Sequence, residues 1–145
     1  MIKGIGHSAF NVTDMATTVA FYEKTLGFQK AFEIPREDTG APWIVYMYAG
    51  GDQFVELFYG AVKQVPYRDE NAGFFHLCLE VDDIHTAWQR IVETGAPQDD
   101  APKKGGDGNW QCWTHDPDGV KLELMQVGEN SLQKKFLRSI VKQLN

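Results

Sequence analysis

Two stretches of the sequence, HSAFNVTD at residues 7–14 and HLCLEVDD at residues 76–83, match each other in pattern. Each begins with a histidine, alternates apolar residues with others as a strand does, and reaches an aspartate seven positions after the histidine. His7 and His76 are 69 positions apart, so the chain carries an internal repeat. Because a repeated unit changes how every motif inside it is interpreted, the predictions of fold and site both start from this repeat.

Each copy of the repeat continues into a predicted helix. Apolar residues follow each aspartate at the i, i+4, i+7 spacing of one buried helix face. Asp14 and Asp83 stand where an N-cap is expected, and Gly27 and Gly95 stand where a left-handed C-cap residue belongs. The sequence therefore predicts two matching helices. Their buried faces hold Met15, Val19 and Tyr22 in the first copy and Ile84, Trp88 and Ile91 in the second.

Each copy ends in a further matching strand, QFVELF at residues 53–58 and VKLELM at residues 120–125. The offset between the final strands is 67 instead of 69. Loops of different length in the two copies produce such a change, since connections tolerate length changes that strands and helices do not. Each copy has room for two more strands between its helix and its final strand. We expect these at residues 28–34 and 43–49 in the first copy, and at 97–102 and 110–115 in the second.

The repeat predicts a single domain over residues 1–145, of the α+β class, built from two tandem βαβββ modules. The first module covers about residues 1–60, a linker covers about 61–72, and the second module covers about 73–127. A C-terminal helix is predicted over about 129–145, with an apolar stripe that could pack on the sheet or on a partner. The stripe consists of Leu132, Phe136, Ile140 and Leu144.

The composition limits the classes of function. Of 145 residues, 14 are Lys or Arg and 20 are Asp or Glu; the net charge of −6 repels phosphate backbones, so we expect no nucleic-acid partner. No apolar run approaches the roughly 20 residues of a membrane helix, and no signal-peptide core is visible, so we expect a cytoplasmic protein without a membrane partner. Cys78 and Cys112 form no CxxC pair, which argues against a disulfide scaffold or a cysteine zinc cluster.

Strand alternation places polar residues of both copies on one face of the sheet. Val55, Leu57, Leu122 and Leu124 provide the apolar face on which the helices pack. Glu56 and Glu123 then point to the other side, where an ionised carboxylate is costly unless it is paired or bound to a metal. Two imidazoles and two carboxylates converging there would make a four-ligand site for Ni, Zn, Co, Fe or Mn. The predicted ligands are His7, Glu56, His76 and Glu123.

A simpler interpretation exists for each of these four residues taken alone. A histidine on a strand is often satisfied within the protein, and a glutamate on a strand is often exposed. Recurrence at matching positions of the repeat favours the metal site, because polar residues repeated on apolar strands have no packing reason.

Several stretches together resemble the vicinal oxygen chelate superfamily, which includes glyoxalase I, bleomycin-resistance proteins, methylmalonyl-CoA epimerase, fosfomycin-resistance enzymes and extradiol dioxygenases. The most specific matches are FYEKTLGF at residues 21–28 and DPDGVKLEL at residues 116–124, and the likeness runs from about residue 4 to residue 127. Within the superfamily, the full His-Glu-His-Glu set is most similar to glyoxalase I.

The resemblance implies an open mixed β-barrel around one divalent metal ion, with Ni, Zn, Co or Mn ahead of Fe. It implies a lyase or isomerase that removes a proton next to a carbonyl of a small vicinal-oxygen substrate, with a metal-stabilised enediolate. Glu123 is the first candidate for the catalytic base and Glu56 the second. A homodimer is also expected, in which the two modules pair within one chain or between chains.

Four further residues are candidates for substrate binding. Phe54 and Phe58 lie on the predicted metal face, where they could form a pocket wall. Lys104 begins a loop similar to the one that covers the substrate in glyoxalase I. Asn11 stands where glyoxalase I enzymes have an arginine, and Gly60 where they have an asparagine, and both of those side chains grip glutathione. Another α-hydroxycarbonyl compound is therefore as compatible a substrate as a glutathione adduct.

Two rival functions stay open at this point. A barrel of this kind could bind a small molecule or an antibiotic without turnover. A ring-cleaving dioxygenase would need Fe(II) and an open coordination position in place of Glu56. Metal analysis separates the three, because the isomerase or lyase predicts Ni, Zn or Co, the dioxygenase predicts iron with oxygen uptake, and absence of metal favours the binder.

Overall fold

The computed structural model describes residues 2–64, 68, 70 and 72–143, so the predicted linker at 61–72 lies partly outside the described residues. The chain forms two compact units that follow the sequence repeat. The first unit comprises Met1–Pro66 with Asp116–Gly119, and the second comprises Tyr67–His115 with Val120–Asn145. Each predicted module therefore has its own unit, but four residues predicted in the second module belong to the first unit.

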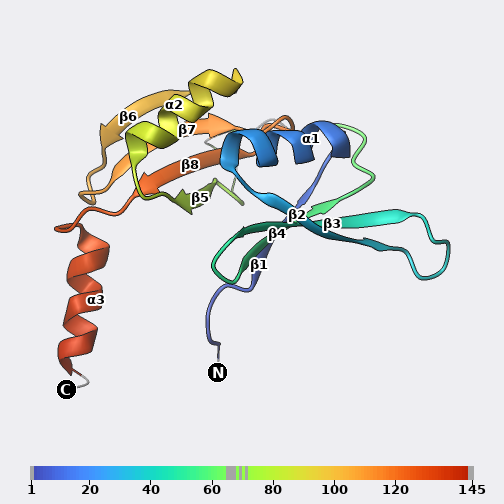
Figure 1. Ribbon diagram of the computed structural model, residues 1–145. Coiled ribbons are helices and arrows are strands. Elements are labelled where there is room, and N and C mark those ends of the chain that lie inside the picture. The colour runs from blue at the N-terminus through green and yellow to red at the C-terminus, as the bar shows by residue number, and fades with distance from the viewer. Residues whose placement is uncertain (1, 65–67, 69, 71, 144–145) are drawn as a thin grey trace. The chain divides into compact units, whose positions relative to one another are not determined.

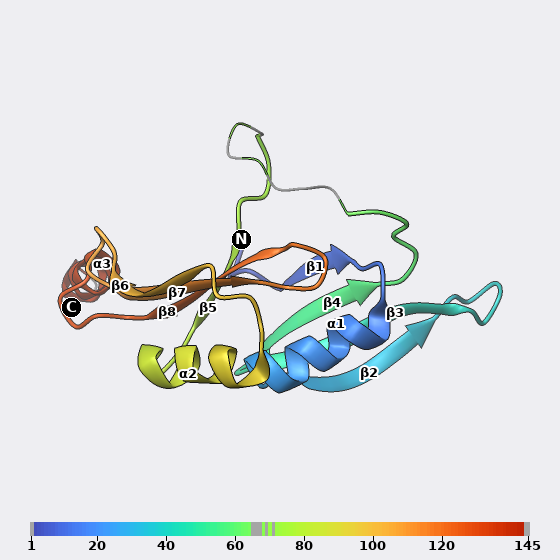
Figure 2. The ribbon, with the colours of Figure 1, turned by 90° about the horizontal axis from the view of Figure 1, so that it is seen from above.

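The first unit has the predicted β-α-β-β-β order. Its elements are β1 (His7–Asn11), α1 (Met15–Phe21), the π-helical segment η1 (Tyr22–Leu26), β2 (Gln29–Pro35), β3 (Pro42–Gly50) and β4 (Gln53–Phe58). The strands lie in the order β1-β4-β3-β2. β1 and β4 are parallel, and the other neighbours are antiparallel. Figure 2 shows α1 running along the strands of this sheet.

The second unit repeats this arrangement. Its elements are β5 (Leu77–Glu80), α2 (Ile84–Thr94), β6 (Asp100–Lys104), β7 (Trp110–His115), β8 (Lys121–Gln126) and α3 (Leu132–Gln143). The strand order β5-β8-β7-β6 matches the first sheet element for element, and again only the pair β5 and β8 is parallel. Within this unit α2 lies along the sheet, as Figure 1 shows.

The predicted caps are confirmed at both matching helices. The Asp14 carboxylate accepts a hydrogen bond from the backbone N–H of Thr17, and Asp83 accepts one from Thr86, each at 2.7 Å. These hydrogen bonds lower the pKa of both aspartates. At the other ends Gly27 has φ +78° and Gly95 has φ +70°, a region that only glycine adopts readily.

The helix-facing sides of the two sheets form the core of the units. The buried apolar residues of the first sheet include Val45, Met47, Val55 and Leu57. In the second unit Ile84 and Ile91 of α2 are fully buried, as are Leu122 and, nearly so, Leu124 on β8. The predicted phase of the final strands is thus confirmed, and Glu56 and Glu123 lie on the opposite faces of their sheets.

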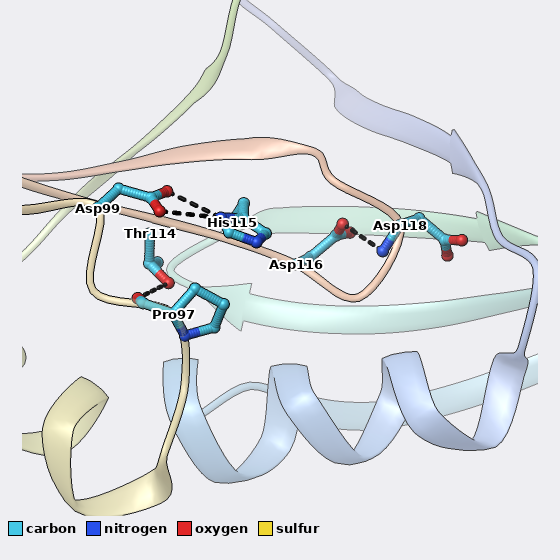
Figure 3. A network of polar contacts seen from close by, with 6 residues as sticks. All are labelled: Pro97, Asp99, Thr114, His115, Asp116 and Asp118. Atoms are coloured by element: carbon cyan, nitrogen blue, oxygen red, sulfur yellow. Dashed lines mark hydrogen bonds and ion pairs between the residues drawn. The ribbon is translucent and has the colours of Figure 1, made fainter. Parts of the chain in front are cut away.

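The second strand of the second copy, β6, begins later than predicted, at Asp100 instead of residue 97. Before it, the carbonyl of Pro97 accepts a hydrogen bond from the Thr114 hydroxyl, which fixes this segment without a strand ladder (Figure 3). Pro102 has no N–H to donate, and the pairing register shifts between Asp100 and Lys103. The prolines therefore move the regular pairing toward the C-terminal end of the segment.

Helix α3 is shorter than predicted and leaves its apolar side exposed. Its residues Leu132, Phe136, Leu137 and Val141 are each more than half exposed, and Leu144 of the predicted stripe lies outside the described residues. The helix is attached at its start, where Gln133 accepts a hydrogen bond from Asn109 at 3.0 Å. Among the described helices, none combines the length and the apolar character needed to cross a membrane.

The turn between β7 and β8 completes the first unit through polar contacts. Asp116 is buried and accepts a hydrogen bond at 3.2 Å from the hydroxyl of Tyr22, itself fully buried. The Asp118 carboxylate accepts hydrogen bonds from the backbone and hydroxyl of Thr13 and from the Thr18 hydroxyl. Figure 3 shows the backbone N–H of Asp118 donating to Asp116, at 2.9 Å. Side-chain carboxylates therefore attach the turn to the N-terminal half of the first unit.

Candidate functional site

In the first unit the predicted ligands His7 and Glu56 are in contact. β1 and β4 are parallel and Ala9 lies opposite Glu56, so His7, two residues earlier, projects on the same face. His7 Nδ1 is 3.4 Å from Glu56 Oε1. The imidazole is half exposed, whereas Glu56 is only 6% exposed. The parity prediction therefore holds for this pair, and the carboxylate is held in a buried position.

Tyr46 is a neighbour of Glu56 that was missing from the predicted site. It lies directly opposite Glu56 on β3, and its hydroxyl donates a hydrogen bond to the carboxylate. That hydrogen bond, together with burial, raises the pKa of Tyr46. Strand alternation in the sequence could have indicated this neighbour. Tyr46 lies between the apolar residues Val45 and Met47, which are buried, so its side chain lies on the opposite face, the one that carries Glu56.

In the second unit His76 and Glu123 form the equivalent pair. His76 Nε2 is 3.0 Å from Glu123 Oε2, and Glu123 is 9% exposed. The edge of the His76 ring meets Trp113, with the ring centroids 4.9 Å apart. The other ring nitrogen, Nδ1 of His76, is buried without a hydrogen-bond partner, which is true of no other side-chain nitrogen or oxygen among the described residues.

Cys78 lies opposite Glu123 on β5 and touches its carboxylate. Cys78 is an exposed residue, but partial burial of its thiol, and then the charge and hydrogen bond of Glu123, raise the pKa of this thiol to about 12. The thiol is therefore protonated at neutral pH and donates to Glu123. Cys112 on β7 is buried, and burial followed by the charge of Glu123 raises its pKa to about 11. Both cysteines are free, and neither has the low pKa of a nucleophilic thiolate.

The predicted substrate-binding residues are divided between the two units. Phe54 and Phe58 lie on the same face of β4 as Glu56, and Asn11, opposite Phe58, is exposed on β1. Lys104 is exposed at the end of β6 and is paired with Trp110, whose ring lies against His85 of α2. Lys104 therefore lies on the face of the second sheet that is turned toward α2, not on the face of Glu123. A substrate contact by Lys104 stays a prediction.

His115 has a partner that the sequence did not indicate. Its Nδ1 is 2.9 Å from the Asp99 carboxylate, in the segment that leads into β6 (Figure 3). The two residues are 16 positions apart and both are partly exposed. An exposed pair of this kind contributes little to stability, so we assign it a local structural role.

The donor set of each pair fits a divalent transition metal. Each unit supplies one imidazole nitrogen and one buried carboxylate within 3.4 Å of each other, and such borderline N/O donors suit Ni, Zn, Co or Mn. A buried carboxylate needs a compensating positive charge, which a cation supplies. Within the described part of the chain, no three or more His, Cys, Asp or Glu residues are arranged so that together they could hold a metal ion. The structure thus presents the four predicted ligands as two pairs.

Comparison with known proteins gives a consistent match. The family model of the Glyoxalase/Bleomycin resistance protein/Dioxygenase superfamily matches residues 4–124. A solved structure described as the glyoxalase family protein from Enterococcus faecalis is 27% identical, with a TM-score of 0.71, over 85% of this chain and 97% of that one. The matched region therefore contains both His-Glu pairs.

Curated relatives carry more than one activity name. The lactoylglutathione lyase of Salmonella typhimurium is 28% identical over 125 residues, covering 83% of this chain and 90% of that protein. The ethylmalonyl-CoA/methylmalonyl-CoA epimerase of Cereibacter sphaeroides is 29% identical over 136 residues, covering 88% of this chain and 100% of that protein. Against a chloroplastic relative from Arabidopsis thaliana, named a probable lactoylglutathione lyase and 30% identical over 84% of this chain, the chain spans 35% of the relative's length.

Proposed function

The chain belongs to the Glyoxalase/Bleomycin resistance protein/Dioxygenase superfamily, and from that premise we propose that it is a divalent-metal-dependent lyase or isomerase of the glyoxalase I type. Its substrate is a small molecule with two adjacent oxygens, and its reaction moves a proton on the carbon next to a carbonyl. One observation carries the proposal: each unit holds a buried glutamate against a histidine at matching positions of the repeat.

In this proposal the four residues that would hold the ion are His7, Glu56, His76 and Glu123. When bound, it supplies a positive charge that stabilises the negative charge developing on the two substrate oxygens. Two carboxylates balance the two positive charges of the ion, which offsets the cost of burying Glu56 and Glu123. The nitrogen and oxygen donors favour Ni, Zn, Co or Mn, with Fe less favoured.

The two glutamates also carry the proton chemistry in this proposal. Glu123 removes the proton from the carbon next to the carbonyl, and Glu56 is the second candidate and returns it. Each carboxylate has a neutral donor beside it, the Tyr46 hydroxyl at Glu56 and the Cys78 thiol at Glu123. These donors hold the carboxylates in place without neutralising them, so both can act on a proton.

The named relatives favour proton transfer over simple binding. One is named a lyase and another an epimerase, and inversion of a carbon centre next to a carbonyl proceeds by removing and returning a proton. Glutathione is not required by the proposal, since Asn11 and Gly60 replace the arginine and asparagine that grip it in glyoxalase I. Gly60 has φ +105°, a backbone conformation that disfavours an asparagine at this position.

Metal analysis tests the proposed function directly. Purified protein reconstituted with Ni, Zn, Co or Mn and analysed by mass spectrometry is expected to retain about one ion per chain. Chelation should abolish exchange of the substrate's α-proton with D2O, measured by NMR for hemithioacetals and for ketoses. His76→Ala should weaken metal binding by at least about 10- to 100-fold, because a ligand matters at least as much as the groups that orient ligands.

His85→Ala is the matched control, because His85 is an exposed histidine of α2 outside the pair. This variant should bind metal as the unmodified protein does. Protein that retains no ion after reconstitution would favour a binding function instead. Iron accompanied by oxygen uptake would favour the dioxygenase.

We also propose that the protein is a homodimer in which α3 packs on a second copy. The helix carries four basic residues and no acidic one, while the rest of the chain holds all 20 acidic residues, so the charges of helix and partner are complementary. Sedimentation should give about twice 16.4 kDa. Phe136→Asp combined with Leu137→Asp should give a monomer, whereas Ser139→Asp, at an exposed polar position of α3, should not. A monomeric unmodified protein contradicts the proposal.

A further inference from the structure

Four aromatic side chains form a continuous patch on the first sheet. Phe32 of β2 stacks on Tyr46 of β3, with ring centroids 4.4 Å apart and planes 22° apart. The Phe54 ring of β4 lies between neighbours, 6.4 Å from Phe32, 6.3 Å from Tyr46 and 5.7 Å from Tyr48. All these separations fall in the range where aromatic rings attract each other. We call these four residues the aromatic patch.

The aromatic patch begins at the proposed metal ligand. Across the sheet, Glu56 lies opposite Tyr46, and Tyr46 lies opposite Phe32, so the three residues form one row. The Tyr46 hydroxyl donates its hydrogen bond to Glu56, and the Tyr46 ring stacks on Phe32. A molecule whose oxygens lie at Glu56 would therefore have the rings beside it.

The rings of the aromatic patch are not needed for the core of the first unit. The core is made on the opposite face, where Val45, Met47 and Val55 are buried. By contrast Phe32 is 48% exposed and Tyr48 is 37% exposed. Several aromatic rings that are gathered together and partly exposed mark a binding surface more often than scattered apolar residues do. The surface offers ring faces and edges, and none of its four side chains carries a charge at neutral pH.

We infer that the aromatic patch binds a flat apolar group of the substrate, such as a phenyl ring attached to the α-hydroxycarbonyl. The inference rests on the proposed function and names its substrate class. A flat ring can stack on Phe32 or meet Phe54 edge to face while the vicinal oxygens lie at Glu56. A charged, peptide-like group gains nothing from these rings, and Asn11 offers it no cation.

Two α-hydroxyketones that differ in one group test this inference. 2-Hydroxyacetophenone carries a phenyl ring where hydroxyacetone carries a methyl group. Their dissociation constants are measured by NMR titration of the full chain, once loaded with nickel and once after chelation. We expect the phenyl ketone to bind about 10-fold more tightly, the size of effect that one or two aromatic contacts provide. Phe32→Ala should reduce the preference to less than about 3-fold.

Two further variants separate loss of the aromatic ring from misfolding and from nonspecific apolar contacts. Phe32→Leu retains an apolar side chain on β2 but removes the ring, so it should also lose most of the preference while remaining folded. Phe136→Ala removes an exposed phenylalanine of α3 and should leave the preference unchanged. Equal affinities for the two ketones, no binding of either, or an unchanged preference in both Phe32 variants would each overturn the inference.

The metal-free titration separates this inference from the proposed function. If no substrate undergoes α-proton exchange but the phenyl preference is present and depends on Phe32, the aromatic patch is a binding site and the catalytic proposal fails. If proton exchange occurs with equal efficiency for both ketones and Phe32→Ala changes neither affinity, the catalytic proposal stands and the aromatic patch has no role in it.

Discussion

Glu123→Gln is expected to lower the turnover number by about 100- to 10,000-fold, the range that positioned acid-base groups contribute. The amide has nearly the shape of the carboxylate, so the second sheet should fold normally around it. One amide oxygen can still face His76, whose Nε2 lies 3.0 Å from the carboxylate now. The amide cannot take up a proton at neutral pH, and this loss is what the measurement reports. The assay is α-proton exchange with saturating metal.

Loss of metal must be separated from loss of the base, because Glu123 has both roles in the proposal. The metal content of Glu123→Gln is therefore measured in the same samples, and the turnover number is referred to the loaded fraction. Glu93→Gln is the matched control, since Glu93 is an exposed glutamate of α2. Glu56→Gln tests the second candidate in the same way. If Glu123→Gln protein that is fully loaded with metal had a near-normal turnover number, Glu123 would not be the catalytic base.

The repeat made most of the fold predictable. Local chemistry alone determines where the first helical segment begins and ends. Asp14 is an N-cap acceptor and Gly27 is a left-handed C-cap glycine, and the structure has both. The two His-Glu pairs were predictable for a similar reason. Strand alternation has a period of two, so the burial of Val55 and Leu57 determines the face on which Glu56 lies.

The aromatic patch was only half predictable. Phe54 follows from the phase of β4, whereas Phe32 does not follow from the phase of β2. The pairing of β2 with β3 shifts between Lys30 and Phe32, so a strict alternation counted from Gln29 assigns the later residues to the wrong face. Such irregularities depend on how two strands fit together, and one strand read alone does not reveal them.

The place of the β7 to β8 turn was not predictable from the repeat. Its partners Thr13, Thr18 and Tyr22 occupy positions that match Asp82, Ala87 and Ile91 of the second copy, as the 69-residue offset shows. At two of the three positions, those of Thr18 and Tyr22, the first copy has a hydroxyl that contacts the turn where the second copy has an apolar side chain. The difference was visible, but the interacting residues are about 100 positions apart, and only the folded chain shows the partner.

Asp116→Ala is expected to lower the free energy of unfolding by about 3 kcal/mol. The Asp116 carboxylate is 1% exposed and accepts two hydrogen bonds, from the Tyr22 hydroxyl at 3.2 Å and from the Asp118 backbone at 2.9 Å. Hydrogen bonds to a charged group contribute about 1.5 to 3 kcal/mol each, and the variant also leaves the buried Tyr22 hydroxyl without this acceptor. Denaturant unfolding followed by circular dichroism measures the change. Asp52→Ala, at the exposed turn before β4, should change stability by less than about 0.5 kcal/mol.

The effect of pH on Tyr22→Phe tests whether the Tyr22 phenol is buried beside Asp116 as the structure shows. Burial, and then the charge of Asp116, raise the pKa of Tyr22 well above its ordinary value of 10.0. The unfolded chain therefore ionises this phenol at a lower pH than the folded chain does, and the protein loses stability as pH rises above about 10. Tyr22→Phe should be less stable at pH 7 by about 1 to 2 kcal/mol but should lose less of its remaining stability between pH 9 and about 11. Equal alkaline losses in both proteins would mean that folding does not raise the pKa of Tyr22, which would contradict a phenol buried beside Asp116.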